Sequence, residues 1–422
     1  MPMPLPGLLS RFTYRSWVVD YSVVSKVRAL ICFTHSIDCP KVLENCMEII
    51  FWLAVVGSIY SYFIYPMTLL LLRSRRTEKL STGGTLPSVT MIITAHNESH
   101  RIEEKLRNTL AIDYPGEKLE VIVASDASSD ATDEIVKGYS SNGIKLVRAN
   151  ERKGKEYAQW HAIKAARGEI LVFSDVATRI PVDGVRLIVK YFADPKVGAV
   201  SSEDRFINES GKLIGEGAYV KYEMWLRRLE SDINSLVGLS GSFFAARKEV
   251  CGVWDINVPS DFNTALNSVR QGYVAVTAPD VHGFYTDIKD EHREYQRKLR
   301  TVIRGISAIF VKPQVLSPFH FGFFSYQVWS HKIMRWLVPW FLLAALLANI
   351  TIVDAHWIYR TSLAVQILFY GLITVGLVVK PLRRVAIVKL PFFFAQVNFA
   401  IAHATLAFLL GKRMTTWEPS KR

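Results

Sequence analysis

Gly168-Glu-Ile-Leu-Val-Phe-Ser-Asp-Val-Ala-Thr-Arg-Ile-Pro181 is the stretch that decides the fold, a short apolar run that ends in Asp175. Apolar residues bounded by a glycine and a proline predict a buried strand of a parallel sheet. Open α/β sheets bind ligands beyond the carboxyl ends of such strands, so Asp175 would lie at a ligand site. Asp175 could equally cap the turn that follows. The other motifs of the chain help to decide between these two roles of Asp175.

The composition indicates a water-exposed domain combined with membrane segments. Of the 422 residues, 50% are hydrophobic and 21% are charged, and the formal net charge is +13. The chain is too apolar for an ordinary soluble protein and too charged for a pure bundle of membrane helices. A positive charge suits nucleic acid, an anionic membrane surface or phosphorylated small molecules. Membrane proximity favours the last two, and we predict no nucleic-acid partner.

The cysteines point to a reducing environment. Cys32, Cys39, Cys46 and Cys251 show neither metal-ligand spacing nor the pattern of a disulfide framework. We therefore expect the main domain to face the cytoplasm. Residues 1–15 lack the apolar core of a cleavable signal peptide.

Long apolar stretches predict membrane-spanning helices on both sides of the main domain. We expect transmembrane helices at residues 47–72, 333–353 and 357–379. An N-terminal arm, residues 1–46, is expected on the membrane surface, and residues 311–332 form an interfacial segment.

Basic clusters at 73–76, 332–335 and 380–384 are cytoplasmic by the positive-inside rule. They place the protein in the plasma or inner membrane with its main domain inside. The last apolar stretch, 390–410, contains the polar residues Gln396, Asn398 and His403. Whether it spans the membrane, re-enters it or lies flat stays open.

Residues 86–310 alternate strand-like and helix-like segments, which predicts a largely parallel sheet. The first strand ends in Thr94-Ala-His-Asn-Glu-Ser99 rather than in a glycine-rich turn, so a dinucleotide-binding fingerprint is absent and an NAD enzyme is disfavoured. The predicted strands lie at 89–94, 120–124, 145–147 and 169–174, and the predicted helices include 100–110 and 157–166.

Polar residues follow several of these strands. Asp126 ends the second strand and is a ligand candidate, whereas Asp130 is better explained as a helix cap. Lys155 closes a basic turn before a helix, which is either solvated or positioned to receive a diphosphate. Asp261 opens a later helix and could cap it or act chemically. Arg297 and Arg300 share one helical face and could also form a polybasic patch for anionic lipids.

The order of these features resembles the membrane-embedded family-2 glycosyltransferases, which include the cellulose, hyaluronan and poly-N-acetylglucosamine synthases. The resemblance covers the chain from about residue 48 onward. It implies an α/β catalytic domain of the GT-A type, with a mixed, mainly parallel sheet, joined to α-helical transmembrane segments.

The resemblance also implies roles for individual residues. Ala95, His96, Glu98 and Asp126 look like the base- and ribose-contacting positions, and Lys155 looks like a residue on the diphosphate side. Asp175 is similar to the first aspartate of the Asp-x-Asp metal motif, which implies Mg²⁺ or Mn²⁺. Asp261 is similar to the catalytic aspartate, and Arg297 and Arg300 fall at the Gln-x-x-Arg-Trp motif.

Two positions depart from the family pattern. Ala177 replaces the second metal aspartate, so Asp175 is the only ligand from that motif. Thr301 replaces the tryptophan that would stack on an acceptor sugar, which weakens the inference of processive synthesis.

The implied function is inverting transfer of a sugar from a nucleotide-sugar, a UDP-sugar, to a saccharide or lipid-linked acceptor at the cytoplasmic membrane face, in cell-surface polysaccharide synthesis. Addition of one sugar to a lipid carrier is an alternative within the same class. A non-catalytic nucleotide-binding scaffold would have no need for Asp261. A polybasic lipid- or nucleic-acid-binding protein would have no need for carboxylates at the sheet edge.

Overall fold

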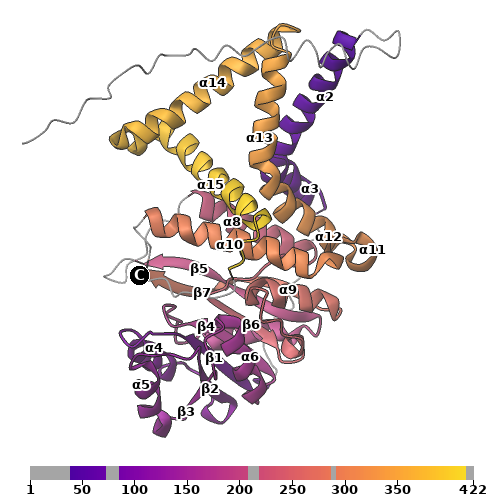
Figure 1. Ribbon diagram of the computed structural model, residues 1–422. Helices are drawn as coiled ribbons and strands as arrows, with labels where there is room; N and C mark the ends of the chain where they lie inside the picture. Colours follow the sequence, from indigo (N-terminus) through magenta and orange to yellow (C-terminus); the bar gives the residue numbers. More distant parts are fainter. Residues whose placement is uncertain (1–38, 73–84, 208–217, 287–290, 415–422) are drawn as a thin grey trace, which may run out of the picture.

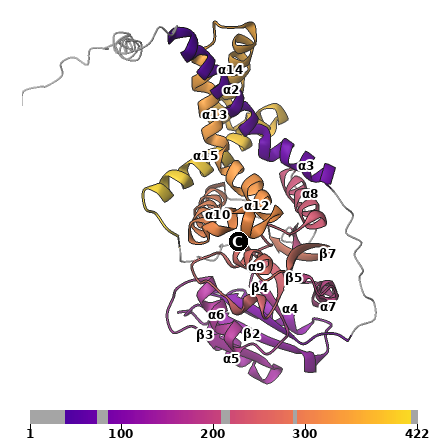
Figure 2. The ribbon, with the colours of Figure 1, turned by 90° about the vertical axis from the view of Figure 1, so that its right-hand side faces the viewer.

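The computed structural model describes residues 39–72, 85–207, 218–286 and 291–414. An α/β domain forms one end of the molecule and long apolar helices form the other (Figure 1). Helices α8 (Ala218–Ile233) and α10 (Glu291–Val311) lie between these two parts (Figures 1 and 2).

The α/β domain is built on a seven-stranded sheet with the order β3-β2-β1-β4-β6-β5-β7. Strands β1 to β4 are parallel, β6 is antiparallel to both of its neighbours, and β5 is parallel to β7. The predicted mixed, mainly parallel sheet is confirmed. The strands are β1 (Val89–Ala95), β2 (Leu119–Ser125), β3 (Ile144–Arg148), β4 (Ile170–Asp175), β5 (Val197–Ile207), β6 (Phe243–Arg247) and β7 (Val274–Thr286).

Both faces of the central strands β1 and β4 are buried. Successive side chains of a strand point to opposite faces, and Met91 joins one core cluster while Ile92 joins the other. Strands covered on both faces read as continuous apolar runs, which explains why the sequence identified them. Helices α4 (Ile102–Leu110), α5 (Thr132–Gly138) and α7 (Gly184–Lys190) cover the first face, and α6 (Lys155–Ala165) and α9 (Ser260–Arg270) cover the second.

Strand β4, the core of the stretch 168–181, lies between β1 and β6. Gly168 packs directly on β1, since a Cβ there would lie 2.3 Å from the backbone nitrogen of Thr90. In the register of the sheet Asp175 pairs with Thr94, and Ala95 pairs with Ser125. The carboxyl ends of β1, β2 and β4 therefore meet at one edge.

Four helical segments in the described part of the chain are long and apolar enough to cross a membrane: Lys41–Leu72, Phe323–Thr351, Trp357–Val378 and Ala386–Leu409. The first two each contain a π-helical turn. The first comprises α2 (Cys39–Ile59), η1 (Tyr60–Ile64) and α3 (Tyr65–Leu72), and the second comprises α12 (Phe323–Val328), η7 (Trp329–Ile333) and α13 (Met334–Thr351). The other two are α14 (Trp357–Val378) and α15 (Ala386–Leu409).

Two helix starts differ from the predicted boundaries. Residues 39–46, predicted as the end of a surface arm, are helical and form the start of α2, and residues 1–38 lie outside the described residues. The helix predicted at 333–353 already begins at Phe323, because the breaking residues Pro313, Pro318 and Gly322 all precede it. The remaining short helices are η2 (Gly116–Lys118), η3 (Ser140–Asn142), η4 (Tyr191–Ala193), η5 (Val250–Gly252), η6 (Pro313–Leu316), α11 (Pro318–Phe321) and η8 (Lys380–Arg384).

The C-terminal half of α15 packs against α10. Ala404 and Phe408 share a core cluster with Leu299 and Ile303 of α10. The end of α15 is therefore held on the side of the α/β domain, as the yellow end of the ribbon shows (Figure 1).

Candidate active site

Asp175 ends β4 and forms an ion pair with Lys155. The Lys155 Nζ lies 2.5 Å from Asp175 Oδ1 and donates to the backbone oxygen of Gly241 at 2.8 Å. Lys155 is buried, whereas 26% of the Asp175 side chain is exposed. The next turn is closed by the Thr178 N–H bonding to the backbone oxygen of Asp175. The carboxylate is thus engaged with a cation at the sheet edge rather than with the turn.

Asp126 holds the loop that positions Lys155. It follows β2, is fully buried, and accepts the backbone N–H groups of Lys153 and Gly154 at 3.0 Å. Gly154 has a φ of 105°, a conformation that side-chain-bearing residues rarely adopt. Helix α6 begins at the next residue. The Asp126 carboxylate, predicted as a ligand position, therefore bonds to the protein backbone.

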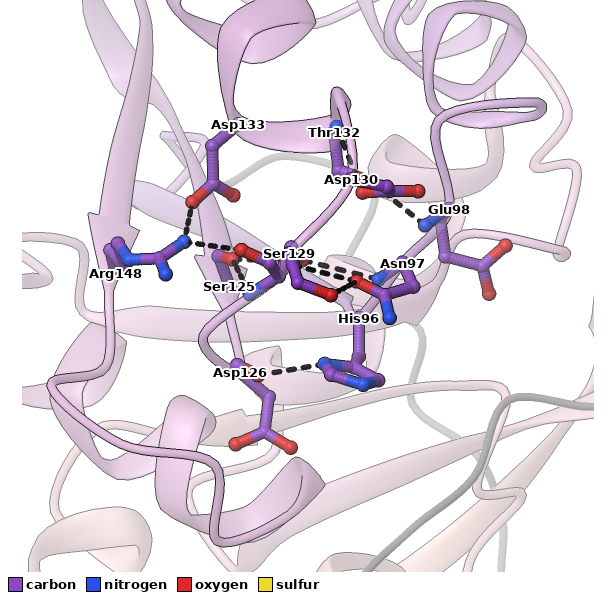
Figure 3. Close-up of polar contacts among 11 residues, drawn as sticks. His96, Asn97, Glu98, Ser125, Asp126, Ser129, Asp130, Thr132, Asp133 and Arg148 are labelled. Atoms are coloured by element: carbon purple, nitrogen blue, oxygen red, sulfur yellow. Dashed lines mark hydrogen bonds and ion pairs between the residues drawn. The ribbon is translucent and has the colours of Figure 1, made fainter.

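The loops after β1 and β2 are hydrogen-bonded to each other (Figure 3). Ala95 is the buried last residue of β1, and the Nδ1 of His96 lies 2.7 Å from the backbone oxygen of Asp126. Asn97 has a φ of 52°, and its Oδ1 accepts the Ser129 N–H at 2.8 Å. These contacts shape the edge of the sheet next to Lys155.

Two carboxylates in these loops have partners within the loops. Glu98 is buried and pairs with Arg101 at 2.5 Å; burial raises the pKa of Glu98, and Arg101 opposes this effect. Asp130 accepts the N–H groups of Ser99 and of Thr132, the first residue of α5. Burial would raise the pKa of Asp130, but these hydrogen bonds outweigh it and lower the pKa to about 2. Asp130 therefore stabilises the helix start, in agreement with the capping interpretation.

A second buried lysine, Lys105 on α4, lies behind Asp175. Its Nζ donates to Ser174 Oγ at 2.7 Å and to the backbone oxygen of Thr178 at 2.5 Å. Burial lowers the pKa of Lys105 to about 7, and the nearby Asp175 carboxylate opposes this shift. Lys105 was not predicted from the sequence. Its signal is that it follows Ile102 by three residues and so shares the buried face of the helix.

Gly241 lies between the Lys155–Asp175 pair and Asp261. Asp261 lies in the first turn of α9, and its backbone oxygen accepts the Leu239 N–H at 3.3 Å. A Cβ on Gly241 would lie 3.5 Å from Asp261 Oδ2. Among the contacts of the described residues, the Asp261 side chain forms no capping hydrogen bond. The structure thus brings Lys155, Asp175 and Asp261 around one glycine.

Asp204 on β5 supports this loop and was also missed. Its Oδ1 accepts the hydroxyls of Ser240 at 2.5 Å and of Ser242 at 2.7 Å. The backbone oxygen of Ser242 in turn accepts the Asp175 N–H at 3.0 Å. Asp204 becomes adjacent to this loop only when β5 joins the sheet, so no local pattern marks it.

Arg297 and Arg300 lie half-buried on α10. Arg304, one turn further on, pairs with the buried carboxylate of Glu156 at 2.6 Å. Glu156 Oε1 also accepts the Ser260 N–H at 3.3 Å. One buried carboxylate therefore joins the starts of α6 and α9 to α10, a link that sequence analysis did not identify.

The site does not hold a ready-made set of metal ligands. No group of three or more His, Cys, Asp and Glu side chains in the described part of the chain could hold a metal ion. Ala177 cannot coordinate, and Lys155 pairs with Asp175. Mg²⁺ is often bound by one or two carboxylates together with substrate phosphates. Asp175 therefore fits as a single metal ligand, with a diphosphate supplying further oxygens.

Comparison with known proteins identifies the α/β domain. Residues 90–252 match the family model of glycosyl transferase family 2. The poly-beta-1,6-N-acetyl-D-glucosamine synthase of Staphylococcus aureus is 30% identical over 234 residues, which cover 53% of this chain and 54% of the synthase. The synthase of the same name from Staphylococcus epidermidis is 30% identical over 217 residues, 50% of each chain. The match thus spans about half the length of these relatives.

Among solved structures, a mannosyltransferase from Pyrobaculum calidifontis in complex with GDP-Man and Mn²⁺ has a similar fold. The TM-score is 0.66 at 23% identity, and the match covers 87% of this chain and 100% of that chain. The GT-A-type architecture is confirmed. Residues 90–252, which include Asp126, Lys155 and Asp175, therefore form a domain that matches glycosyl transferase family 2.

Proposed function

We propose that the chain is an inverting glycosyltransferase that transfers a sugar from a UDP-sugar to a saccharide or lipid-linked acceptor. The arrangement around Gly241 carries this proposal. Lys155, a buried cation that can balance the charge of a diphosphate, donates to the backbone oxygen of Gly241. Asp261, a carboxylate that can accept a proton, lies next to the same glycine. The family-2 domain and the polysaccharide-synthase relatives support the same activity.

In the proposed reaction, an acceptor oxygen attacks the anomeric carbon while the bond from that carbon to the diphosphate breaks. Asp261 takes the proton of the acceptor hydroxyl as general base. The ammonium of Lys155 balances the charge of the nucleoside diphosphate that leaves. A single displacement inverts the anomeric centre, so an α-linked donor yields a β-linked product.

We assign the donor nucleoside to the edge formed by the loops after β1 and β2. Ala95, His96 and Glu98 line this edge, and Asp126 holds it against the start of α6. Arg297 and Arg300 are proposed as further cations for the diphosphate. The test is release of nucleoside diphosphate and transfer of sugar across a panel of nucleotide-sugars. Thermal stabilisation by nucleotide without any turnover would favour the non-catalytic scaffold.

Chelation of divalent cations should abolish transfer. We propose that Asp175 would hold Mg²⁺ or Mn²⁺ together with the oxygens of the donor diphosphate, whose negative charge the metal would neutralise. Without donor, the metal should bind weakly, because Asp175 supplies one ligand and is paired with Lys155. Calorimetric titration of Mn²⁺ with and without UDP measures this difference, and adding back Mg²⁺ to a chelated sample should restore activity. Full activity in excess chelator would show that Lys155, Arg297 and Arg300 carry the leaving-group charge without a metal.

We further propose that the four apolar segments place this domain on the cytoplasmic face of the plasma or inner membrane. A cysteine at Arg384 in η8 should then resist a membrane-impermeant thiol reagent applied to intact cells, whereas one at Asp354 between α13 and α14 should react. Both positions are exposed on the protein, so a difference in labelling reports the side of the membrane on which each one lies. Labelling of the Arg384 position from outside contradicts this topology.

The packing of α15 on α10 supports a surface position for residues 390–410 rather than a full crossing. If η8 and the end of α15 both lie inside, a cysteine at Lys412 should be as protected as one at Arg384. Reaction of the Lys412 position with the external reagent would instead indicate a crossing helix.

A further inference from the structure

The helices that leave the α/β domain carry buried and half-buried polar residues that the proposed mechanism does not use. We call the following residues the junction cluster: Ser61, Glu223, Glu230, His331, Lys332 and Arg335. They come from three separate segments, namely the first apolar helix, α8 of the α/β domain and the helix that begins at Phe323.

The two glutamates of the junction cluster have close partners. Arg335 Nη1 lies 2.6 Å from Glu223 Oε1. Glu230 Oε1 accepts the hydroxyl of Tyr65 at 2.6 Å and lies 2.6 Å from Nδ1 of His331. The negative charges of the cluster are therefore largely engaged within the protein.

The cationic groups keep unused donors. Arg335 is only 8% exposed, yet its Nε and Nη2 have no hydrogen-bond partner. Lys332 forms no hydrogen bond or ion pair with any described residue. Buried polar groups in proteins are almost always hydrogen-bonded. Glu230 Oε2 and Ser61 Oγ also lack a hydrogen-bond partner. Most of the unused hydrogen-bonding groups of the cluster are nevertheless positively charged donors.

Two π-helical turns meet at the junction cluster. Tyr60 of η1 and Ser330 of η7 are linked through their hydroxyls at 3.1 Å. Lys332 belongs to η7 and Ser61 to η1. Such turns redirect side chains and occur frequently at functional sites.

The junction cluster adjoins Asp261. The Nζ of Lys332 would lie 3.8 Å from a Cβ built on Gly238, in the loop that leads to Gly241. Lys332 also interacts electrostatically with Asp261. An acceptor whose hydroxyl reaches Asp261 could therefore place a neighbouring group on Lys332.

We infer that the acceptor is anionic, and that Lys332 and Arg335 bind its phosphate or carboxylate group while Asp261 faces its hydroxyl. This inference rests on the proposed function. Guanidinium and ammonium groups form strong, charge-assisted hydrogen bonds to such oxygens. A lipid-linked diphosphate and an acidic sugar share this chemistry, and the experiment separates them.

The test uses the full chain in lipid nanodiscs with three acceptors: polyprenyl-diphosphate-linked N-acetylglucosamine, an oligosaccharide of glucuronic acid, and an uncharged alkyl N-acetylglucosaminide. The variant is Lys332→Gln, and the matched control is Lys389→Gln, an exposed lysine on α15. We expect Lys332→Gln to raise KM for the anionic acceptor about 10- to 100-fold, as for the loss of a hydrogen bond to a charged group. Donor hydrolysis by water and KM for the neutral acceptor should change less than about twofold. Lys332→Arg, which keeps the charge, should retain most of the affinity and guards against loss through misfolding.

The outcomes show whether the anion belongs to a lipid diphosphate or to an acidic sugar. They also separate failure of the anionic-acceptor inference from failure of the proposed function. Dependence on Lys332 with only the lipid diphosphate, or only with the acidic oligosaccharide, identifies that source. The inference fails if the wild type transfers sugar to the neutral acceptor as efficiently as to both anionic ones. It also fails if Lys332→Gln behaves like Lys389→Gln, because the enzyme then does not recognise the charge of the acceptor. Failure of the wild type to hydrolyse or transfer any nucleotide-sugar instead removes the proposed function itself.

Discussion

Replacing Asp261 with asparagine should lower the rate of sugar transfer by about 10²- to 10⁴-fold, the usual contribution of a general base. The asparagine keeps the shape of the side chain in the first turn of α9 but cannot take a proton. Its amide fits the same space, because Gly241 leaves room next to Asp261 Oδ2. Loss of the carboxylate at a helix start costs about 0.3–1 kcal/mol, so the folded state should persist. Rates measured at saturating donor and acceptor isolate the chemical step.

Asp183→Asn is the matched control for this experiment. Asp183 is exposed and precedes α7, which covers the opposite face of the sheet from α9. The same change there should leave turnover, donor binding and melting temperature close to those of the wild type. If Asp261→Asn transfers sugar within a few-fold of the wild type, Asp261 is not the base. The proposed proton transfer then has to be assigned to another group.

Replacing Lys155 with methionine should reduce kcat/KM for the donor by about 10²- to 10³-fold, comparable to removing one preorganised donor from a developing negative charge. Methionine preserves most of the buried volume at the start of α6 but removes the only cation that contacts both Asp175 and Gly241 among the described contacts. Asp175 is partly exposed, so water can solvate the carboxylate left behind. We therefore expect the loss to appear in catalysis and donor binding rather than in folding.

Lys164→Met tests whether any lysine of α6 would have the same effect. Lys164 lies on the exposed side of this helix, with its Nζ 3.3 Å from the ring centroid of Trp160. This control should keep full activity, and Lys155→Arg should retain part of it because the charge remains. Wild-type activity in Lys155→Met would contradict the assignment of Lys155 to the diphosphate side. A loss of activity accompanied by a marked fall in the melting temperature would point to a purely structural role.

The four parallel strands β1 to β4 were predicted from short apolar runs, whereas β5 and β7 were not predicted. Residues 169–174 and 89–94 are apolar on both faces, as strands covered on both sides must be, and both runs form neighbouring strands. The position of Asp175 at the carboxyl edge follows from the same reasoning. The predicted span at 333–353 lies largely within a longer helix that begins at Phe323, and the aromatic residues after Gly322, which look interfacial in sequence, are helical as well.

The site was predictable only where a residue sits at the end of a strand or helix. Asp175, Lys155 and Asp261 were identified in this way, and the fold brings them together around Gly241. Asp126 was identified too, but its carboxylate turned out to face the backbone of the 153–154 turn, a partner that strand position does not reveal.

The residues alone determined the parallel strands β1 to β4, the apolar helices and the chemical groups at the strand ends, because periodicity and turn-forming residues act over a few positions of the chain. Lys105, Asp204 and the junction cluster depend instead on contacts between segments distant in sequence, such as α8 with the helix that begins at Phe323. Removing one partner of a buried ion pair is strongly destabilising, so buried charges depend on partners that the folded structure brings to them. For that reason the pairing of Glu223 with Arg335, 112 positions away, and the unused donors beside it emerge only once the helices have packed.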